Sequence, residues 1–143
     1  MDVFRLHRRG RDWADATGAS LASGRWHTIG TPVIYTAQNI ALALLETLVH
    51  AEGRTIPPRA ITRITIPDSL AIEHSAWIDE PASQTFGDQF VARATASVLK
   101  VPSIVVEKRE FNFVLNPAHP SFKTITAHPT EDFEIDPRFI LFP

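Results

Sequence analysis

The sequence lacks cysteine altogether. Disulfide bonds, thiolate zinc sites and cysteine nucleophiles are therefore excluded, and nothing in the chain requires an oxidising compartment. Long apolar runs are missing too, because the longest, residues 40–45, is far short of the roughly 20 residues that span a bilayer. Residues 1–11 lack the apolar core of a signal peptide. We therefore expect a cytoplasmic protein without a membrane partner.

The chain also lacks the common motifs for nucleotides and metals. It has no glycine-rich dinucleotide fingerprint, no Walker phosphate loop and no His-Glu-x-x-His helix. Its six histidines show no i, i+3 or i, i+4 pairing of the kind that a helical metal site uses: His7, His27, His50, His74, His119 and His128. We therefore expect no bound metal and no resident cofactor.

The charges nearly cancel and are unevenly spread. The 14 basic and 16 acidic residues leave a formal net charge of −2, which argues against a general polyanion binder, so we expect no direct nucleic-acid binding. Residues 1–63 hold eight arginines, no lysine and five acidic residues, whereas residues 64–143 hold six basic and eleven acidic residues. Because a guanidinium fork matches phosphate and carboxylate oxygens, we expect an anionic ligand to bind the first half.

The 143 residues have the size of one domain, and the pattern of apolar residues predicts an α+β fold. Apolar runs and alternation predict six strands, at residues 2–6, 32–35, 60–66, 103–107, 111–115 and 122–127. The remaining predicted elements are a helix that follows a start signal at residues 36–39 and runs to about residue 50, a helix at 87–99, a helical turn at 11–16, a loop at 18–24 and a turn at 116–120.

Glu46 directly follows the apolar run of the first predicted helix. A buried carboxylate without partners is costly, so its position needs an explanation. One interpretation is structural: His50, four residues further along the same helical face, pairs with the carboxylate. In the other, the helix lines a cleft, and Glu46 meets a ligand hydroxyl or a developing positive charge.

Three further residues stand in patterns that suit ligand binding. Arg25 lies between small residues and Trp26, which favours an anion site, although an arginine beside a tryptophan also stacks without any ligand. Tyr35 ends a predicted buried strand, where it is either an ordinary residue at the edge of the core or a stacking ring with its hydroxyl in a cavity. Ser103 has no His/Asp partner pattern, so we expect a hydrogen-bond donor rather than a nucleophile.

These residues lie in sequence segments that resemble the RES-domain family, which is named for an Arg, a Glu and a Ser. The shared segments are, in order, Ser-Gly-Arg-Trp-His, Pro-Val-Ile-Tyr-Thr-Ala, Ala-Leu-Leu-Glu-Thr-Leu-Val-His, Val-Pro-Ser and Leu-Asn-Pro-Ala-His-Pro. The resemblance runs from Val3 to Arg138. It implies a single RES domain over residues 1–143, with an ADP-ribosyltransferase-like fold in which helices flank a twisted, mainly antiparallel sheet.

The resemblance also implies a function. RES proteins are the toxins of bacterial type II toxin–antitoxin pairs, consume NAD as a substrate and bind an Xre-like helix-turn-helix antitoxin. NAD and such an antitoxin are therefore the implied partners, and self-association into a homo-oligomer stays open. The family's functional positions fall on Arg5, Arg25, Tyr35, Glu46 and Ser103, and the matching segments also contain His27, Asn116 and His119.

From this resemblance we predict catalytic roles for Glu46, Arg25, Tyr35 and Ser103, and NAD-binding roles for Arg5, Arg25, Tyr35, Ser103, His27 and Asn116. Arg5 and Arg25 are expected to bind the diphosphate or nearby ribose oxygens. Tyr35 is expected to stack on nicotinamide, and Ser103 to hydrogen-bond the ribose or amide on the nicotinamide side. Asn116 and His119 could instead simply hold their Asn-Pro and His-Pro turn.

The implied reaction is cleavage of the nicotinamide N-glycosidic bond of NAD, with Glu46 stabilising the oxocarbenium character that builds on the ribose. Water, phosphate or a protein side chain then attacks. Leu44, rather than a second glutamate, lies two residues before Glu46, which favours hydrolysis or phosphorolysis over ADP-ribosylation of a protein. The sequence is also compatible with a non-catalytic nucleotide-binding or interaction module and with a DNA-binding regulator that uses residues 5–11.

Overall fold

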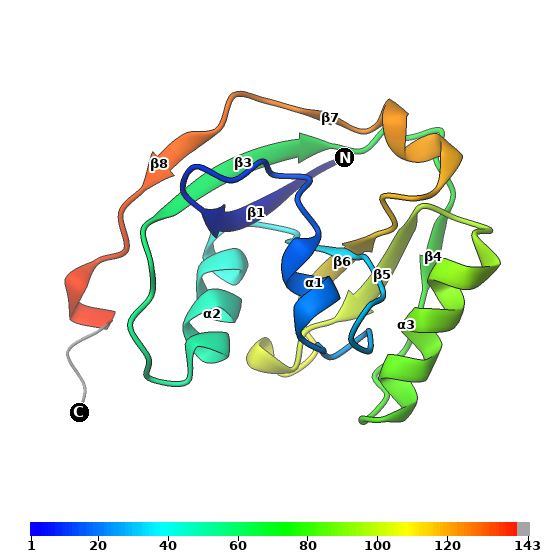
Figure 1. The fold of residues 1–143 in the computed structure, drawn as a ribbon, viewed down its shortest axis with the longest axis horizontal. Helices are drawn as coiled ribbons and strands as arrows, with labels where there is room; N and C mark the ends of the chain where they lie inside the picture. The colour runs from blue at the N-terminus through cyan, green and yellow to red at the C-terminus, as the bar shows by residue number, and fades with distance from the viewer. Residues whose placement is uncertain (140–143) are drawn as a thin grey trace.

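A computed structural model describes residues 1–139 and confirms a mixed α+β fold (Figure 1). The strands are β1 (Asp2–Arg8), β2 (Ile34–Ala37), β3 (Arg59–Thr65), β4 (Ile72–His74), β5 (Val98–Pro102), β6 (Phe111–Leu115), β7 (Thr126–Ala127) and β8 (Glu131–Phe133). The α-helices are α1 (Thr17–Leu21), α2 (Ile40–Ala51) and α3 (Ala82–Arg93), and the 3-10 helices are η1 (Ile104–Val106), η2 (Pro120–Thr124) and η3 (Pro137–Phe139).

The strands form one sheet, in the order β4-β5-β6-β2-β1-β3-β7, with β8 also paired to β3. Each pairing is antiparallel except that of β4 with β5. The sheet curls, so that β1 and β3 arch over α2, whereas β4 and β5 lie beside α3 (Figure 1). The predicted mainly antiparallel sheet with flanking helices is therefore confirmed.

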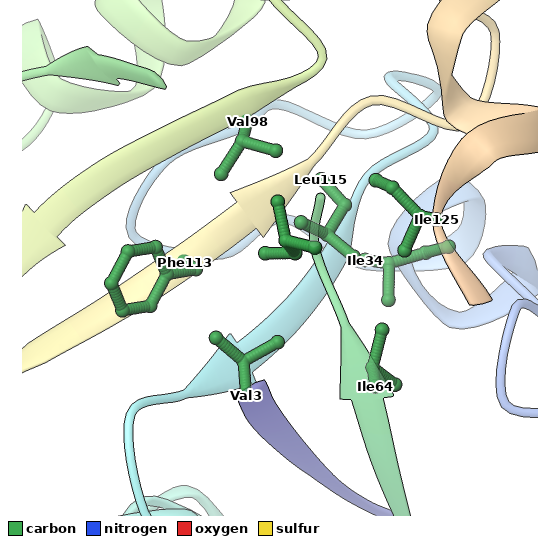
Figure 2. Close-up of a cluster of buried hydrophobic side chains, with 8 residues drawn as sticks. Val3, Ile34, Ile64, Val98, Phe113, Leu115 and Ile125 are labelled. Atoms are coloured by element: carbon green, nitrogen blue, oxygen red, sulfur yellow. The ribbon is translucent and has the colours of Figure 1, made fainter. Parts of the chain in front are cut away.

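One face of the sheet, called here the first face, carries a cluster of buried apolar side chains (Figure 2). Its members are Val3, Ile34, Ile64, Ile66, Val98, Phe113, Leu115 and Ile125. Because successive side chains of a strand point to opposite faces, Arg5 and His7 of β1 share this face with Val3. Two polar side chains therefore extend the apolar cluster along β1.

The opposite face, called the second face, packs against α2 and α3. At one end, Leu42 and Ala43 of α2 pack on Ala37 of β2. At the other end, Trp26 and the α3 residue Phe90 join a buried cluster with apolar side chains of β5 and β6. The functional side chains described below lie between these two packed ends.

Helix α2 begins where a side chain satisfies one of its free amides. Asn39 has an extended backbone, and its Oδ1 accepts a hydrogen bond from the Leu42 amide at 2.8 Å. The helix ends at Ala51, and Gly53 then adopts a φ of 77°. The predicted helix to about residue 50, with its start signal at residues 36–39, is therefore confirmed, although β2 occupies the first two residues of that signal.

Two predicted elements of the second half are wrong in position or type. The helix predicted at residues 87–99 lies earlier, at α3, and its last two predicted residues belong to β5. Gly87 lies inside α3, where a Cβ atom would stand 1.7 Å from the carbonyl oxygen of Trp26. Close approach of two backbones, and not a helix boundary, therefore explains this glycine. The strand predicted at residues 103–107 is instead the 3-10 helix η1 with its flanking turns.

Three smaller differences concern short segments of the chain. Of residues 122–127, the first three belong to η2, which begins at Pro120, and the last two form β7. Residues 11–16 form turns, and α1 follows inside the expected loop at 18–24, because Asp15 Oδ1 accepts the Thr17 amide at 2.9 Å and so favours a helix start there. At the start of η2, His119 Nδ1 accepts the Ser121 amide at 3.0 Å, so a local hydrogen bond accompanies the start of each helix.

Four strand predictions hold within two residues at either end. Residues 2–6, 32–35, 60–66 and 111–115 correspond to β1, β2, β3 and β6.

Within residues 1–139, no helix combines the length and the apolar character needed to cross a membrane.

Candidate active site

Glu46 lies on α2 where two later segments of the chain meet it. Its Oε1 accepts hydrogen bonds from the Ser103 hydroxyl at 2.6 Å and from Asn112 Nδ2 at 2.7 Å. Neither donor bonds Oε2, so one oxygen of the carboxylate is left for a ligand. Within residues 1–139 these donors, rather than His50, are the partners of Glu46, and His50 is exposed. The purely structural pairing with His50 is therefore wrong.

The register of the sheet explains why these side chains meet. Asn112 of β6 lies opposite Val101 of β5 and Ala37 of β2. Ser103 follows Val101 by two residues, so its side chain points to the second face together with that of Asn112. Helix α2 starts directly after β2 and packs on the same face, which places Glu46 over both donors.

Tyr35 belongs to the same face. It lies opposite Val114 in the pairing of β2 with β6, which makes it a diagonal neighbour of Asn112. Such neighbours lie about 7 to 8 Å apart. The predicted site residues Tyr35, Glu46 and Ser103 are therefore gathered on one side of the sheet.

The hydroxyl of Tyr35 is committed to hydrogen bonds within the protein. It accepts the Trp26 amide at 3.1 Å and lies 2.7 Å from His27 Nδ1. Nε2 of His27 donates to the carbonyl oxygen of Ala22 at 2.7 Å, so in the neutral ring Nδ1 accepts the proton of the phenol. Burial raises the pKa of Tyr35 well above its usual value. The expectation that this hydroxyl faces a cavity is therefore wrong, and His27 acts here by holding Tyr35.

The segment that carries Arg25 is clamped to α3. The hydroxyl of Ser83 donates to the carbonyl oxygen of Arg25 at 2.6 Å, and Gln84 Nε2 donates to that of Gly24 at 3.0 Å. A Cβ atom on Gly24 would lie 2.8 Å from the Tyr35 hydroxyl oxygen, so only glycine fits. The backbone on either side of Arg25 is thus fixed against both the helix and Tyr35.

The Arg25 guanidinium is half-exposed and stacks on a ring distant in sequence. Its Cζ lies 4.7 Å from the centre of the Trp77 ring, and its Nε lies 3.7 Å from Glu80 Oε1. The neighbouring Trp26 is instead buried in the core. The sequence offers two interpretations of Arg25, an anion site and stacking on the adjacent Trp26. The structure shows the stacking, but on Trp77.

Arg5 lies on the first face, away from these residues. Its guanidinium donates to the carbonyl oxygens of Trp13 and Asp15, the latter at 3.0 Å. Burial lowers the pKa of Arg5 to about 10, and the charges of Asp15 and Asp12 act in the opposite direction. The structure therefore does not bring Arg5 together with Glu46.

Asn116 and His119 hold the turn after β6. Asn116 is 1% exposed, its Oδ1 accepts the Ala118 amide at 3.1 Å, and its Nδ2 donates to the Val91 carbonyl oxygen at 3.4 Å. His119 Nδ1 accepts the Ser121 amide at 3.0 Å. These contacts match a turn-holding role and engage both polar atoms of the Asn116 amide.

Asn112 is the site residue that sequence reasoning missed. Its signal is the pattern Phe-Asn-Phe at residues 111–113, which places one polar side chain on the face opposite the two phenylalanines. A strand-by-strand assignment of faces would have found it.

No three His, Asp or Glu side chains within residues 1–139 gather as metal ligands would. The described site therefore consists of one carboxylate held by two neutral donors, beside an aromatic ring.

Comparisons with known proteins show the family of this chain. Residues 2–136 match the family model for the RES domain. The chain is 34% identical over 142 residues to a protein of Sphingobium sp. (strain YBL2) named Prs ADP-ribosylating toxin, which covers 90% of this chain and 88% of the relative. It is also 34% identical over 135 residues to Toxin Res of Photorhabdus laumondii subsp. laumondii, with 87% and 86% covered.

A solved structure supports the same fold. The crystal structure of the M. tuberculosis MbcT-MbcA toxin-antitoxin complex contains a chain that superposes with a TM-score of 0.76, at 16% identity, over 92% of this chain and 83% of that one. At this identity the likeness concerns the fold alone. Together with the family match and the curated relatives, it confirms the resemblance seen in the sequence: this protein is a member of the RES-domain family of toxins.

Proposed function

We propose that this toxin breaks the N-glycosidic bond between nicotinamide and ribose in NAD. The observation that carries the proposal is the carboxylate of Glu46, which Ser103 and Asn112 hold through Oε1 and leave free at Oε2. A fixed carboxylate beside the ribose stabilises the positive charge that develops there in the transition state more than it stabilises the ground state.

The chemistry of NAD needs one carboxylate only. As the bond breaks, its electron pair goes to the ring nitrogen, so the nicotinamide cation leaves as a neutral molecule without a general acid. The ribose C1′ then carries oxocarbenium character, as in glycoside cleavage. Glu46 faces this carbon in the proposed complex, and Ser103 and Asn112 act as positioning residues.

Tyr35 and Arg25 supply binding in this proposal. The ring of Tyr35 lies on the same sheet face as Asn112 and is half-buried, which suits stacking on nicotinamide. Its hydroxyl does not take part, because Trp26 and His27 already use it. Arg25 keeps an exposed guanidinium for the phosphates, whereas the donors of Arg5 already bind backbone oxygens.

The group that attacks the ribose defines two versions of the reaction. The leucine at position 44 favours water or phosphate over a transferase with a second glutamate two residues before Glu46. The name of the Sphingobium relative, Prs ADP-ribosylating toxin, favours transfer to a protein instead. Both versions share the same bond cleavage at Glu46, so we treat protein ADP-ribosylation as the second candidate function.

An antitoxin is the proposed protein partner. The structural neighbour was solved as a toxin-antitoxin complex, and the Photorhabdus relative carries the name Toxin Res. The sequence resemblance implies an Xre-like helix-turn-helix protein for this role. Such a partner controls the toxin by covering the second face at Glu46.

The test measures nicotinamide release from NAD by antitoxin-free protein, in buffer, with phosphate and with cell extract. Mass detection of the co-product names the attacking group. Glu46→Gln lowers the rate by about 100-fold or more, the usual loss for one group that stabilises transition-state charge. Glu52→Gln is the matched control, because Glu52 is exposed at the end of the same helix.

Two outcomes contradict the proposal. One is a Glu46→Gln protein as active as wild type. The other is folded wild-type protein that leaves NAD intact under all three conditions; if that protein still binds NAD, it is a non-catalytic nucleotide-binding module.

A further inference from the structure

Two cations from different parts of the chain converge on Trp77. Arg25 Cζ lies 4.7 Å and Lys108 Nζ lies 5.6 Å from the centre of its ring. Trp77 is half-buried, and its Nε1 donates to Asp79 at 3.0 Å, which fixes the ring. Exposed like charges repel, so their gathering on one ring needs a reason beyond the modest attraction of a cation for an aromatic face.

The backbone places Lys108 there under strain. Glu107 and Lys108 adopt φ values of 55° and 66°, a left-handed conformation that non-glycine residues seldom adopt, and here two are consecutive. The amide of Lys108 donates to the carbonyl oxygen of Ser103 at 2.7 Å. Because Ser103 also holds Glu46, the turn ties the position of the lysine to that of the carboxylate.

Both cations are weakly neutralised. Arg25 has an ion pair with Glu80 at 3.7 Å, in which both side chains are exposed to solvent and which therefore contributes little. Lys108 is exposed and forms no salt bridge within residues 1–139. The next residue, Arg109, instead pairs with Glu107 at 3.3 Å. The Trp77 ring thus presents a guanidinium fork and an ammonium group, each available to an anion.

We propose that Trp77, Arg25 and Lys108 form the subsite for the diphosphate of the dinucleotide, and that Lys108 makes the enzyme selective for phosphate-bearing substrates. This inference rests on the proposed function, because it deepens the same site. The arginine supplies a bidentate contact and the lysine a point charge. Trp77 orients the two cations, because both lie over its ring.

The first test compares two substrates with the same glycosidic bond: NAD, and nicotinamide riboside, which has no phosphate. Lys108→Gln raises KM for NAD about tenfold, the effect of losing one charge-assisted contact, with kcat unchanged. It leaves nicotinamide riboside cleavage unchanged, and Lys108→Arg restores much of the affinity for NAD. Arg109→Gln is the matched control, since it removes the same charge from the adjacent position.

The second test does not depend on turnover. ADP-ribose is titrated into the Glu46→Gln protein and into its Lys108→Gln, Arg109→Gln and Trp77→Phe derivatives, with calorimetry as the readout. We expect Lys108→Gln to weaken ADP-ribose binding about tenfold and Arg109→Gln to leave it unchanged. This result stands even if wild type leaves NAD intact, so failure of the proposed function and failure of the subsite are distinguishable. Equal effects of Lys108→Gln and Arg109→Gln, or no binding of ADP-ribose, would overturn the subsite.

Discussion

Arg5 and Arg25 were both expected to bind phosphate, yet the fold uses the two guanidinium groups differently. Arg5 points to the first face of the sheet, where its donors bind the carbonyl oxygens of Trp13 and Asp15. Arg25 belongs to the segment that covers the second face, and its guanidinium has one exposed ion pair and an aromatic ring as neighbours. The first arginine organises backbone, and the second is open to a ligand.

The two faces of the sheet also differ in how far their polar side chains are used by hydrogen bonds within the protein. On the first face, His7 Nε2 and Thr62 Oγ1 lie 2.8 Å apart and are buried, so their polar atoms serve each other. On the second face, the Oε2 of Glu46 is not used by the two donors that hold the carboxylate. A polar residue therefore becomes a candidate for function when its hydrogen-bonding capacity exceeds what its neighbours use.

Gly87→Ala gives the largest expected effect. The added methyl group would meet the carbonyl of Trp26 at 1.7 Å, so α3 has to move away from the segment that carries Arg25. We expect a loss of about 3 kcal/mol in the free energy of unfolding, measured by urea denaturation, together with lower NAD turnover by the folded fraction.

Gly18→Ala is the control for this change, because nothing lies within 4 Å of a Cβ atom at that helical position. It should leave stability unchanged or raise it slightly. A Gly87→Ala protein as stable as wild type would show that α3 and the Trp26 backbone are not in close contact.

Arg5→Met tests the first face and should affect stability alone. It leaves the carbonyl oxygens of Trp13 and Asp15 without their donor, which costs about 2 kcal/mol of the free energy of unfolding. The KM of the folded protein for NAD should stay at the wild-type value. Arg11→Met, at an exposed position in the same loop, is the control for loss of charge. A large rise in KM with unchanged stability would return Arg5 to the substrate site.

Asp15→Asn gives the smallest effect, a slight loss of stability above about pH 4 that disappears in acid. Hydrogen bonds from the hydroxyl and amide of Thr17 lower the pKa of Asp15 from 3.8 to about 2. Because the folded-state pKa lies below the unfolded value, the charged form stabilises the fold above about pH 4, and this contribution is lost as the pH falls to 2. Asp15→Asn should therefore flatten the decrease in unfolding free energy between pH 4 and 2. If the unfolding free energy of the variant falls between pH 4 and 2 as steeply as that of the wild type, Asp15 does not cause this decrease.

Much of the fold could be predicted because strand periodicity is local. Four strands and the body of α2 follow from alternation and from the cap at Asn39. The errors at residues 87–99 and 103–107 have a non-local origin. Gly87 serves a contact with Trp26, 61 residues earlier in the chain, and the amide of Ser103 donates to the carbonyl oxygen of Glu110, just before β6. No pattern within either segment carries that information.

The site was predicted through residue types and the family resemblance rather than through geometry. Glu46 stood out because it follows an apolar run, whereas Ser103 received its role from the resemblance, and the structure joins them by a hydrogen bond. Their link to Asn112 requires the register of β5 against β6, which single-sequence reasoning did not assign. The partner of Arg25 was missed for the same reason, since Trp77 lies in an irregular segment and 52 residues further along the chain.

The separation in sequence between Glu46 and its donors has a consequence during synthesis. Ser103 follows Glu46 by 57 residues and Asn112 follows it by 66 residues. A nascent chain that has emerged from the ribosome only as far as β5 therefore carries the glutamate without the two groups that hold it. Because domains fold as units, the assembled site arises only after β6 has emerged and paired with β5.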